Sequence, residues 1–269
     1  MIRQPIQTRT RIALGVGSVL LLLILYAGLS VRQHRINPKD TTMPGLSQFV
    51  EGWKMILTPE AKEGAWYDAW IFADVWATCS RLALGLLAGI LLSVVIGMAM
   101  GCFTGAEAFF TPPLSFLAKI PPTAMLAVYF VLFGTEMKMY VAMIALGIFP
   151  TLAQSIHQAA KKDVSDHVIY KAYTLGASHL EVIWNVVFRQ ILPRIIESIR
   201  LQVGPAMVFL IAAEWMNADV GFGYRLRIQS RLLHMNVVYT YLVFLGATGY
   251  LMDWGLSSLR RKLCPWFGE

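Results

Sequence analysis

The sequence predicts an all-α polytopic membrane protein with six membrane-spanning helices. Of its 269 residues, 57% are hydrophobic and only 14% are charged, whereas soluble domains carry about 25% charged residues. The hydrophobic residues gather in stretches close to the roughly 20 residues that a helix needs to cross a bilayer. One polar segment, residues 161–194, interrupts this pattern between two of the stretches.

The basic residues follow the ends of the apolar stretches. The net charge of +7 therefore indicates membrane topology better than nucleic-acid binding, which favours basic patches interleaved with aromatic residues. Cys79, Cys102 and Cys264 are odd in number and lack metal-ligand spacing. We interpret the cysteines as small hydrophobic residues and expect neither a metal nor a cofactor in this chain.

The first predicted span covers residues 12–31, with no charge between Arg11 and Arg32. A cleaved signal peptide is the alternative, but its apolar core is normally about 7 to 15 residues long, so a retained span is favoured. Residues 45–57 carry apolar side chains at helical spacing on one face. We expect an amphipathic helix there, at the external membrane surface.

Five further apolar runs complete the six spans. They are residues 82–106, 108–133, 139–156, 195–216 and 237–252. Residues 74–81 are expected to form the first turns of the second span, and residues 217–236 a loop. The third run contains two proline pairs, Pro112-Pro113 and Pro121-Pro122. Since proline removes helix hydrogen bonds, this span should be bent and buried in the bundle.

The distribution of basic residues predicts the orientation. Six spans place both termini on the same side, and short cytoplasmic loops are enriched in Lys and Arg. The N-terminus, the polar segment 161–194 and the C-terminus are all basic, whereas Arg225, Arg227 and Arg231 oppose this orientation. We expect both termini in the cytoplasm because three segments agree.

The polar segment predicts two short helices joined at a glycine. Asp163 and Asp166 can cap the first helix, and residues 178–181 (Ser-His-Leu-Glu) fit the capping box of the second. Gly176 lies between them, where a helix end often needs a left-handed residue. Such a turn could present Val168, Tyr170, Tyr173 and Leu175 to a groove on a soluble partner. On composition alone, a solvated hairpin that only links two spans is the alternative.

Three ionisable residues, Arg81, Lys119 and Glu214, lie in or beside the apolar runs. Charged groups inside a membrane are costly and usually face a cavity or a partner. Three roles are open to them: structural ion pairing, lining of a pathway or gate in which Arg81 or Lys119 meets Glu214, and reaching toward the membrane surface.

Residues 170–178 resemble the Glu-Ala-Ala, three residues, Gly motif of permease subunits of ATP-binding cassette importers, with Gly176 at the spacing of the motif. Tyr170 and Lys171 replace the glutamate and the first alanine, and Phe188-Arg189 replaces a later Leu-Pro. Further segments resemble the nitrate/sulfonate/taurine permease group. These are residues 120–134, 145–150, 174–178, 212–214, 221–224 and 260–266.

The resemblance covers about residues 74–266 and implies the type I importer fold. Residues 1–73 would add the first span and the external amphipathic segment, and residues 161–189 would carry a cytoplasmic coupling helix that docks in a cleft of an ATPase subunit. The implied coupling residues are Tyr170, Lys171, Ala172, Thr174, Leu175, Gly176, Ala177 and Ser178. The implied pathway or gate residues are Arg81, Lys119, Pro121, Pro122, Glu214, Gly221 and Gly223.

The resemblance also implies the cellular setting and the partners. The chain would be a multi-pass protein of the bacterial inner membrane that imports a small anion of the nitrate, sulfonate, taurine or bicarbonate class. Its expected partners are two cytoplasmic ATPase subunits, which hold the ATP and Mg, a second copy of itself, membrane lipid, and a periplasmic or lipid-anchored binding protein. The chain itself would hydrolyse nothing.

Two other classes of protein remain as alternatives. A self-sufficient carrier or channel would show inverted repeats or broken helices around a midplane site, and we find no repeat that links the first three spans to the last three. A membrane-embedded enzyme would need a nucleophile, base or metal set at one depth, and no such cluster is visible in the sequence.

Overall fold

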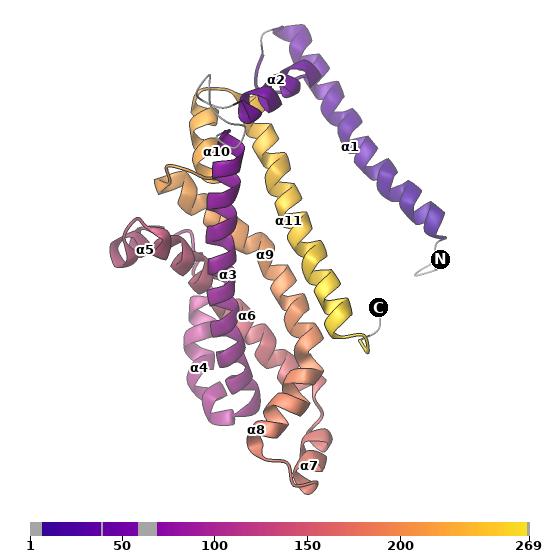
Figure 1. Ribbon diagram of the computed structural model, residues 1–269, viewed down its shortest axis with the longest axis vertical. Coiled ribbons are helices and arrows are strands. Elements are labelled where there is room, and N and C mark those ends of the chain that lie inside the picture. The colour runs from indigo at the N-terminus through magenta and orange to yellow at the C-terminus, as the bar shows by residue number, and fades with distance from the viewer. Residues whose placement is uncertain (1–6, 39, 59–68, 268–269) are drawn as a thin grey trace. The chain divides into compact units, whose positions relative to one another are not determined.

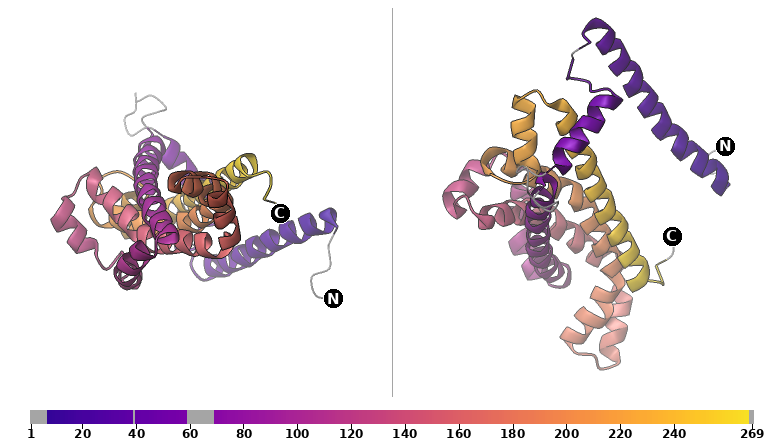
Figure 2. Two further views of the ribbon diagram at one scale, coloured as in Figure 1. Left: turned by 90° about the horizontal axis from the view of Figure 1, so that it is seen from below. Right: turned by 45° about the horizontal axis from the view of Figure 1, so that its top comes forward.

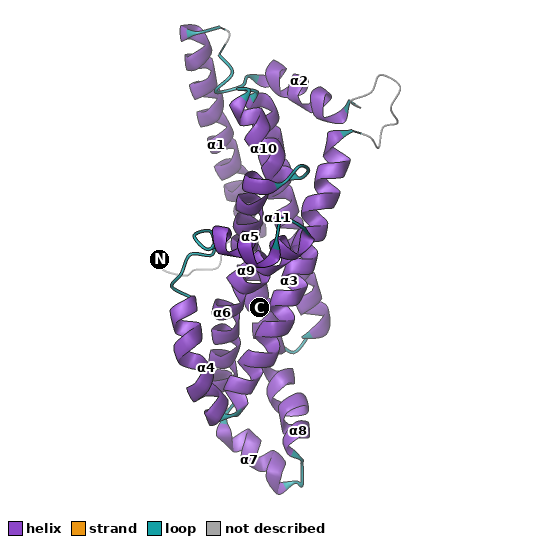
Figure 3. Cartoon of the chain, turned by 90° about the vertical axis from the view of Figure 1, so that its left-hand side faces the viewer, coloured by secondary structure: helices purple, strands orange, loops and turns teal. Residues whose placement is uncertain are grey.

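The computed structural model describes residues 7–38, 40–58 and 69–267, which form helices joined by turns and loops (Figure 3). The helices are α1 (Thr8–Ile36), α2 (Leu46–Leu57), α3 (Trp70–Cys102), α4 (Thr104–Leu117), α5 (Leu126–Phe133), α6 (Met137–Asp163), α7 (Asp166–Thr174), α8 (His179–Glu181), a π-helical stretch (Val182–Phe188), α9 (Arg189–Asn217), α10 (Phe222–Arg231) and α11 (Met235–Leu263). The prediction of residues 217–236 as a loop is wrong, because α10 occupies half of that segment.

Five of the described helical segments are long and apolar enough to cross a membrane. They are Thr8–Ile36, Trp70–Cys102, Met137–Asp163, His179–Asn217 and Met235–Leu263. Each contains one of the predicted spans or most of it, and α3 includes residues 74–81 as its first turns.

Residues 108–133 differ from the single bent span that the sequence predicts. They form the end of α4 and then α5, joined by turns over residues 118–125. Pro112 and Pro113 lie inside α4, whereas Pro121 and Pro122 lie in the connecting turns. A proline lacks the N–H that the helix ladder needs, and it disfavours helical geometry in the residue before it. The second proline pair therefore separates the helices.

The described residues form two compact units. The first contains the described residues as far as Trp70 together with Ile228–Leu242, and the second contains Ile71–Arg227 and the described residues from Val243 onward. The predicted domain boundary between residues 73 and 74 stays a prediction. In the first unit, the rings of Tyr26, Phe49 and Tyr239 meet with centroids 5.9–6.1 Å apart.

In the second unit, α3 packs against α6 through small residues at every fourth position. They are Gly85, Gly89, Ser93, Gly97 and Gly101. A Cβ at residue 85 would lie 2.6 Å from Ile144 Cβ, and one at residue 97 would lie 2.8 Å from the carbonyl oxygen of Ala153. This stripe allows the two helix backbones to approach closely, as small residues do in many membrane helix pairs.

Helices α6 and α9 run antiparallel and form the centre of the second unit (Figures 1 and 2). The hydroxyl groups of Ser155 and Ser198 are 2.7 Å apart, and the ring of Phe209 lies over Gly147. The hairpin of α7 and α8 lies at one end of this pair. The C-terminal end of α9 lies at the other, roughly 40 Å away at 1.5 Å per helical residue.

Candidate functional site

The α7–α8 hairpin has the geometry that the sequence predicts at Gly176. Gly176 adopts a φ of 86°, and the N–H of Ala177 donates to the carbonyl of Ala172 at 3.1 Å. The N–H of Gly176 donates to Tyr173 at 2.9 Å. These two bonds satisfy the last carbonyls of α7 and form a Schellman motif, which requires a left-handed residue at this position.

The N-termini of both short helices are capped by serine. The hydroxyl of Ser165 accepts the N–H of His167, so the prediction that Asp163 or Asp166 caps α7 is wrong. Asp166 is instead the first helical residue. The capping box predicted for α8 is confirmed: the Ser178 N–H donates to the Glu181 carboxylate at 2.8 Å, and the Glu181 N–H donates to the Ser178 hydroxyl at 3.4 Å.

The hairpin has an inner and an outer face. Ala172 and Ala177 pack against a buried cluster that includes Val182, Val187 and Ile191. The other residues predicted for coupling are exposed, and they are Tyr170, Lys171, Thr174, Leu175, Gly176 and Ser178. This places a rigid, capped turn at the end of the bundle.

Large apolar side chains of the hairpin are exposed. Tyr170 is 63% exposed, Leu175 80% and Leu180 69%. Exposed apolar residues that cluster on a rigid element mark an interaction surface more often than isolated ones do.

A buried ion pair joins α3 to the C-terminal end of α9. Nη1 of Arg81 lies 2.8 Å from Oε1 of Glu214, whose side chain is fully buried. The Thr78 hydroxyl donates to the same carboxylate at 3.0 Å, and the Gly223 N–H donates to it at 2.9 Å. Arg81 also donates to the carbonyl of Val220 at 2.7 Å. Of the two pairings considered from the sequence, Arg81 with Glu214 is the observed one.

A second ion pair extends this cluster to α10. Nε of Arg225 lies 2.8 Å from Oδ2 of Asp74, which is fully buried. The other carboxylate oxygen of Asp74 accepts the N–H of Gly221 at 2.8 Å. The Arg81 guanidinium stacks over Tyr140 of α6, 4.2 Å from the ring centroid. Four elements of the second unit therefore meet at these two carboxylates, and we call this group the acid–arginine cluster.

Asp74, Thr78 and Arg225 belong to this cluster but were not predicted as site residues from the sequence. Asp74, Thr78 and Arg81 are spaced i, i+4 and i+7, which places them on one face of α3. A polar stripe at helical spacing at the beginning of a long apolar helix was the signal that could have found the cluster.

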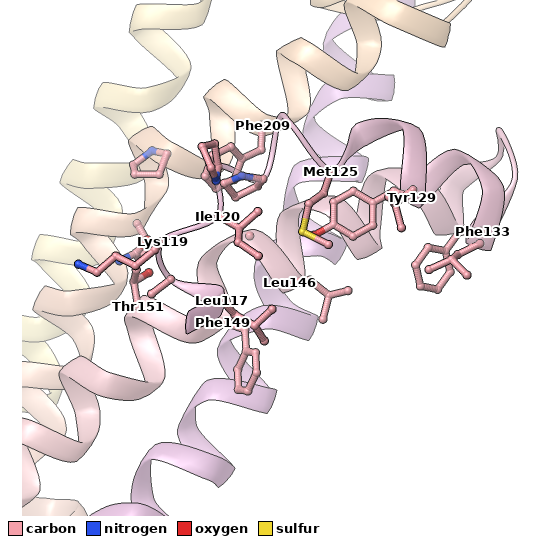
Figure 4. Close-up of a pocket in the computed structure, with 18 residues that line it drawn as sticks. Leu117, Lys119, Ile120, Met125, Tyr129, Phe133, Leu146, Phe149, Thr151 and Phe209 are labelled. Atoms are coloured by element: carbon pink, nitrogen blue, oxygen red, sulfur yellow. The ribbon is translucent and has the colours of Figure 1, made fainter. Parts of the chain in front are cut away.

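Lys119, Pro121 and Pro122 line a cavity of about 530 Å³ between α4, α5, α6 and α9 (Figure 4). Most of its other lining residues are apolar, including Met125, Leu146 and Phe209. The structure thus divides the predicted pathway residues into two groups. Arg81, Glu214, Gly221 and Gly223 belong to the acid–arginine cluster, and Lys119 with the two prolines belongs to this cavity.

Metal-ligating side chains do not gather in the part of the chain that the structure describes. No group of three or more His, Cys, Asp or Glu residues there could hold a metal ion. The histidines near the hairpin have other contacts: His179 Nδ1 lies 2.9 Å from the Tyr173 hydroxyl, and His157 Nε2 lies 3.4 Å from Glu107.

Comparisons with known proteins agree with this geometry. The sequence model of the family described as "binding-protein-dependent transport system inner membrane component" matches residues 85–263. Among curated proteins, the chain is 29% identical to the taurine transport system permease protein TauC of Escherichia coli (strain K12), over 96% of this chain and 91% of that protein.

Two other relatives carry different substrate names. The putative aliphatic sulfonates transport permease protein SsuC of Bacillus subtilis is 28% identical over 73% of this chain and 71% of its own length. The nitrate import permease protein NrtB of Synechocystis is 23% identical over 88% of this chain and 86% of its own length.

A solved structure shares the fold. A chain of the MetNI methionine ABC transporter, solved in inward-facing conformations, matches with a TM-score of 0.63 at 16% sequence identity. The match covers 72% of this chain and 95% of that chain.

Proposed function

This chain belongs to the family of binding-protein-dependent transport system inner membrane components, and we propose from this that it carries a small anion of the nitrate, sulfonate, taurine or bicarbonate class. It is a multi-pass inner-membrane permease subunit of an ATP-binding cassette importer with the type I importer fold. ATP hydrolysis in such importers occurs in a separate ATPase subunit. The substrate class is supported by the names of relatives that transport taurine, aliphatic sulfonates and nitrate.

The observation that carries the proposal of an ATP-driven mechanism is the α7–α8 hairpin. Its backbone is closed by a Schellman motif and a capping box, and the side chains of Tyr170, Leu175 and Leu180 are exposed. A rigid turn with exposed apolar side chains can transmit motion from a partner that binds it. We assign the coupling role to residues 170–178 on this basis.

The replacement of an acidic residue by Tyr170 gives this docking surface an aromatic character. Tyrosine supplies a large apolar contact area and a hydroxyl group at its tip. The ATPase cleft that receives it should therefore present an apolar surface rather than a cation. Lys171, beside it, is exposed and suits an acidic residue on the ATPase.

The proposed assembly has two copies of this chain, two cytoplasmic ATPase subunits, which bind ATP and Mg, and an external binding protein. Helices α3 and α6 run in the same direction, so α4 and α5 together would return the chain across the membrane as the sixth crossing. The hairpin and both termini would then face the cytoplasm, in line with the basic residues of all three segments. The acid–arginine cluster, at the opposite end of α9, would then face the outside. We assign it to the outer gate region that the binding protein contacts.

The experiment is ATP-driven uptake by the importer in proteoliposomes, with substitutions at Gly176. A Cβ at residue 176 has nothing within 4 Å, so only the φ of 86° restricts the substitution. A β-branched residue tolerates that conformation poorly, with a strain of about 1–3 kcal/mol. Gly176→Val should reduce uptake about tenfold or more, while the chain still inserts and ATP is still hydrolysed.

Two control variants make this result specific. Gly176→Asn should retain most uptake, since asparagine adopts left-handed geometry more easily. Gly105→Val tests a glycine in open space without positive φ and should behave as wild type. Full uptake by Gly176→Val would contradict the coupling role. Uptake by the purified chain without an ATPase would instead identify a self-sufficient carrier.

A further inference from the structure

The cavity beside Lys119 is polar at one end and apolar at the other. In Figure 4, Lys119 and Thr151 lie together at one end, whereas Tyr129 and Phe133 lie at the far end. Its volume of about 530 Å³ falls within the range of roughly 300–1,000 Å³ that is usual for small-molecule sites. Such sites have mostly apolar walls and a few placed polar groups.

The helix register adds a third polar residue to the Lys119 end. The antiparallel α6–α9 pair brings Ser155 to Ser198 and Gly147 to Phe209. Between these two contacts, Thr151 therefore faces Gln202 across the pair. Gln202 is one of the residues that line the cavity.

Two of the polar groups at this end are available to a ligand, whereas the Thr151 hydroxyl donates its hydrogen to the carbonyl of Ile148 at 3.0 Å. Within the described part of the chain, neither the Lys119 amine nor the Gln202 side-chain amide has a hydrogen-bond or ion-pair partner. An ammonium and an amide on residues that line one cavity can both donate hydrogen bonds to an anion. Charge-assisted hydrogen bonds of this kind are roughly twice as strong as neutral ones.

The residues that line the cavity disfavour two kinds of substrate within the proposed class, zwitterions and small inorganic anions. No aspartate or glutamate occurs among the described residues that line the cavity, so the ammonium group of a zwitterion has no carboxylate to meet. A small inorganic anion would lose its water at the apolar walls and gain no contact from them.

We propose that this cavity binds an organic monoanion with an apolar body, such as an alkanesulfonate. The anionic group would lie at Lys119 and Gln202, and the apolar body would extend toward Tyr129 and Phe133. The proposal rests on the importer function and narrows its substrate class. It also assigns a binding site to the permease itself, in addition to the one in the external binding protein.

Binding can be measured by calorimetric titration of the permease–ATPase complex in nanodiscs of zwitterionic lipid. The probes are ethanesulfonate, butanesulfonate, hexanesulfonate, taurine and nitrate. Each added CH₂ that enters the apolar end should tighten binding about fourfold. Hexanesulfonate should therefore bind most tightly, and taurine and nitrate should not bind detectably. Equal affinity along the series, or tighter binding of nitrate or taurine, would overturn the proposal.

Substitutions locate the site. Lys119→Gln should weaken hexanesulfonate binding about tenfold or more, and Leu146→Trp should abolish it by filling the cavity. Lys138→Gln removes an exposed lysine that does not line the cavity and should leave the affinity unchanged. Co-purification of the ATPase and a symmetrical gel-filtration peak establish that each variant is folded. An unchanged affinity in Lys119→Gln or in Leu146→Trp would refute the assignment.

A membrane lipid or fatty acid could supply the same chemistry, and competition separates the two sources. If oleate or phosphatidylglycerol displaces hexanesulfonate at the lipid's ordinary membrane content, the cavity is a lipid site and the proposal fails. Stimulation of ATP hydrolysis by the binding protein, measured in the same preparation, tests the importer function independently. Stimulation without alkanesulfonate binding would reject this inference alone, whereas its absence in a folded complex would reject the proposed function.

Discussion

Gly221 lies directly against the buried carboxyl group of Glu214. A Cβ at residue 221 would be 2.7 Å from Cδ and Oε1 of Glu214, and one at residue 223 would be 2.6 Å from its Cβ. The two glycines thus allow the backbone after α9 to close over the carboxylate, which the Gly223 N–H then binds. Their role follows from this close approach, in addition to the φ of 128° at Gly221.

Replacement of Gly221 by alanine should therefore destabilise the fold strongly. The new Cβ would collide with a carboxyl group that is held by Arg81 and Thr78, and the positive φ adds backbone strain. We expect the free energy of unfolding to fall by about 2–4 kcal/mol, measured by thermal unfolding in detergent. Gly204→Ala is the matched control on α9, where a Cβ has nothing within 4 Å. Equal unfolding temperatures of the two variants would show that the contact is not tight.

Removal of the arginine cation from the acid–arginine cluster should lower the free energy of unfolding more than removal of a lysine cation from the surface. Arg81→Met leaves the buried Glu214 carboxylate without its counter-charge, and breaking a buried pair on one side costs about 3–5 kcal/mol. Lys161→Met breaks the pair with Glu107, in which the side chains are 51% and 25% exposed, and should lower the stability much less, because solvent screens an exposed pair. Thermal unfolding of both variants tests this order, and similar losses would contradict it.

The Glu107–Lys161 contact predicts a pH dependence outside the membrane spans. The hydrogen bond from Lys161, together with the charges of Lys161 and His157, lowers the pKa of Glu107 below its usual 4.5. A lowered folded-state pKa stabilises the protein above the unfolded pKa, and this contribution is lost as pH falls through the folded value. The difference in stability between wild type and Glu107→Gln should thus be present at about pH 5–6 and shrink below about pH 4.

Unfolding temperatures of the two proteins at several pH values check this prediction. The variant supplies the control, because the other carboxyl groups titrate in both proteins. A stability difference that grows on acidification would give the opposite sign and would refute the assigned cause.

The hairpin was predictable from sequence because its signals are local. Gly176 lies at the one position of a Schellman motif that needs a left-handed residue, and Ser178 and Glu181 form a capping box within four residues. The choice between Ser165 and the neighbouring aspartates as the cap of α7 was not predictable, since both residue types cap helices well.

The acid–arginine cluster and the packing of α3 against α6 were not predictable, because both depend on contacts between residues far apart in the sequence. Hydropathy shows that α3 is apolar but not which face meets which helix. The spacing of the small residues at positions 85, 89, 93, 97 and 101 marks the face of α3 that meets another helix. Glycine is too common in membrane helices for this spacing to identify the partner helix. The Pro121-Pro122 pair separates α4 from α5. From the sequence, only a bend was predicted there.

The glycine stripe on α3 predicts a rescue that depends on position. At Gly89, the two atoms nearest to a new Cβ are Cδ1 and Cγ1 of Ile148, both at 2.7 Å, and the Cα of Ala145 follows at 3.0 Å. At Gly97, the nearest atom is the backbone carbonyl oxygen of Ala153, at 2.8 Å. Shortening Ile148 to alanine removes its Cδ1 and Cγ1 and can therefore relieve an alanine at residue 89. At residue 97, shortening Ile156 leaves its Cβ and the Ala153 carbonyl in place.

Double-mutant cycles in thermal unfolding measure this difference. Gly89→Ala and Ile148→Ala should be coupled favourably by about 1–2 kcal/mol, within the range seen for residues in contact. Gly97→Ala combined with Ile156→Ala should show a smaller coupling, because the clash with the Ala153 carbonyl persists in the double variant. Each single variant supplies its own reference, so the large cavity left by Ile→Ala cancels in the cycle. Equal coupling in the two cycles would mean that α3 and α6 shift apart as rigid helices, and that the stripe does not set their distance.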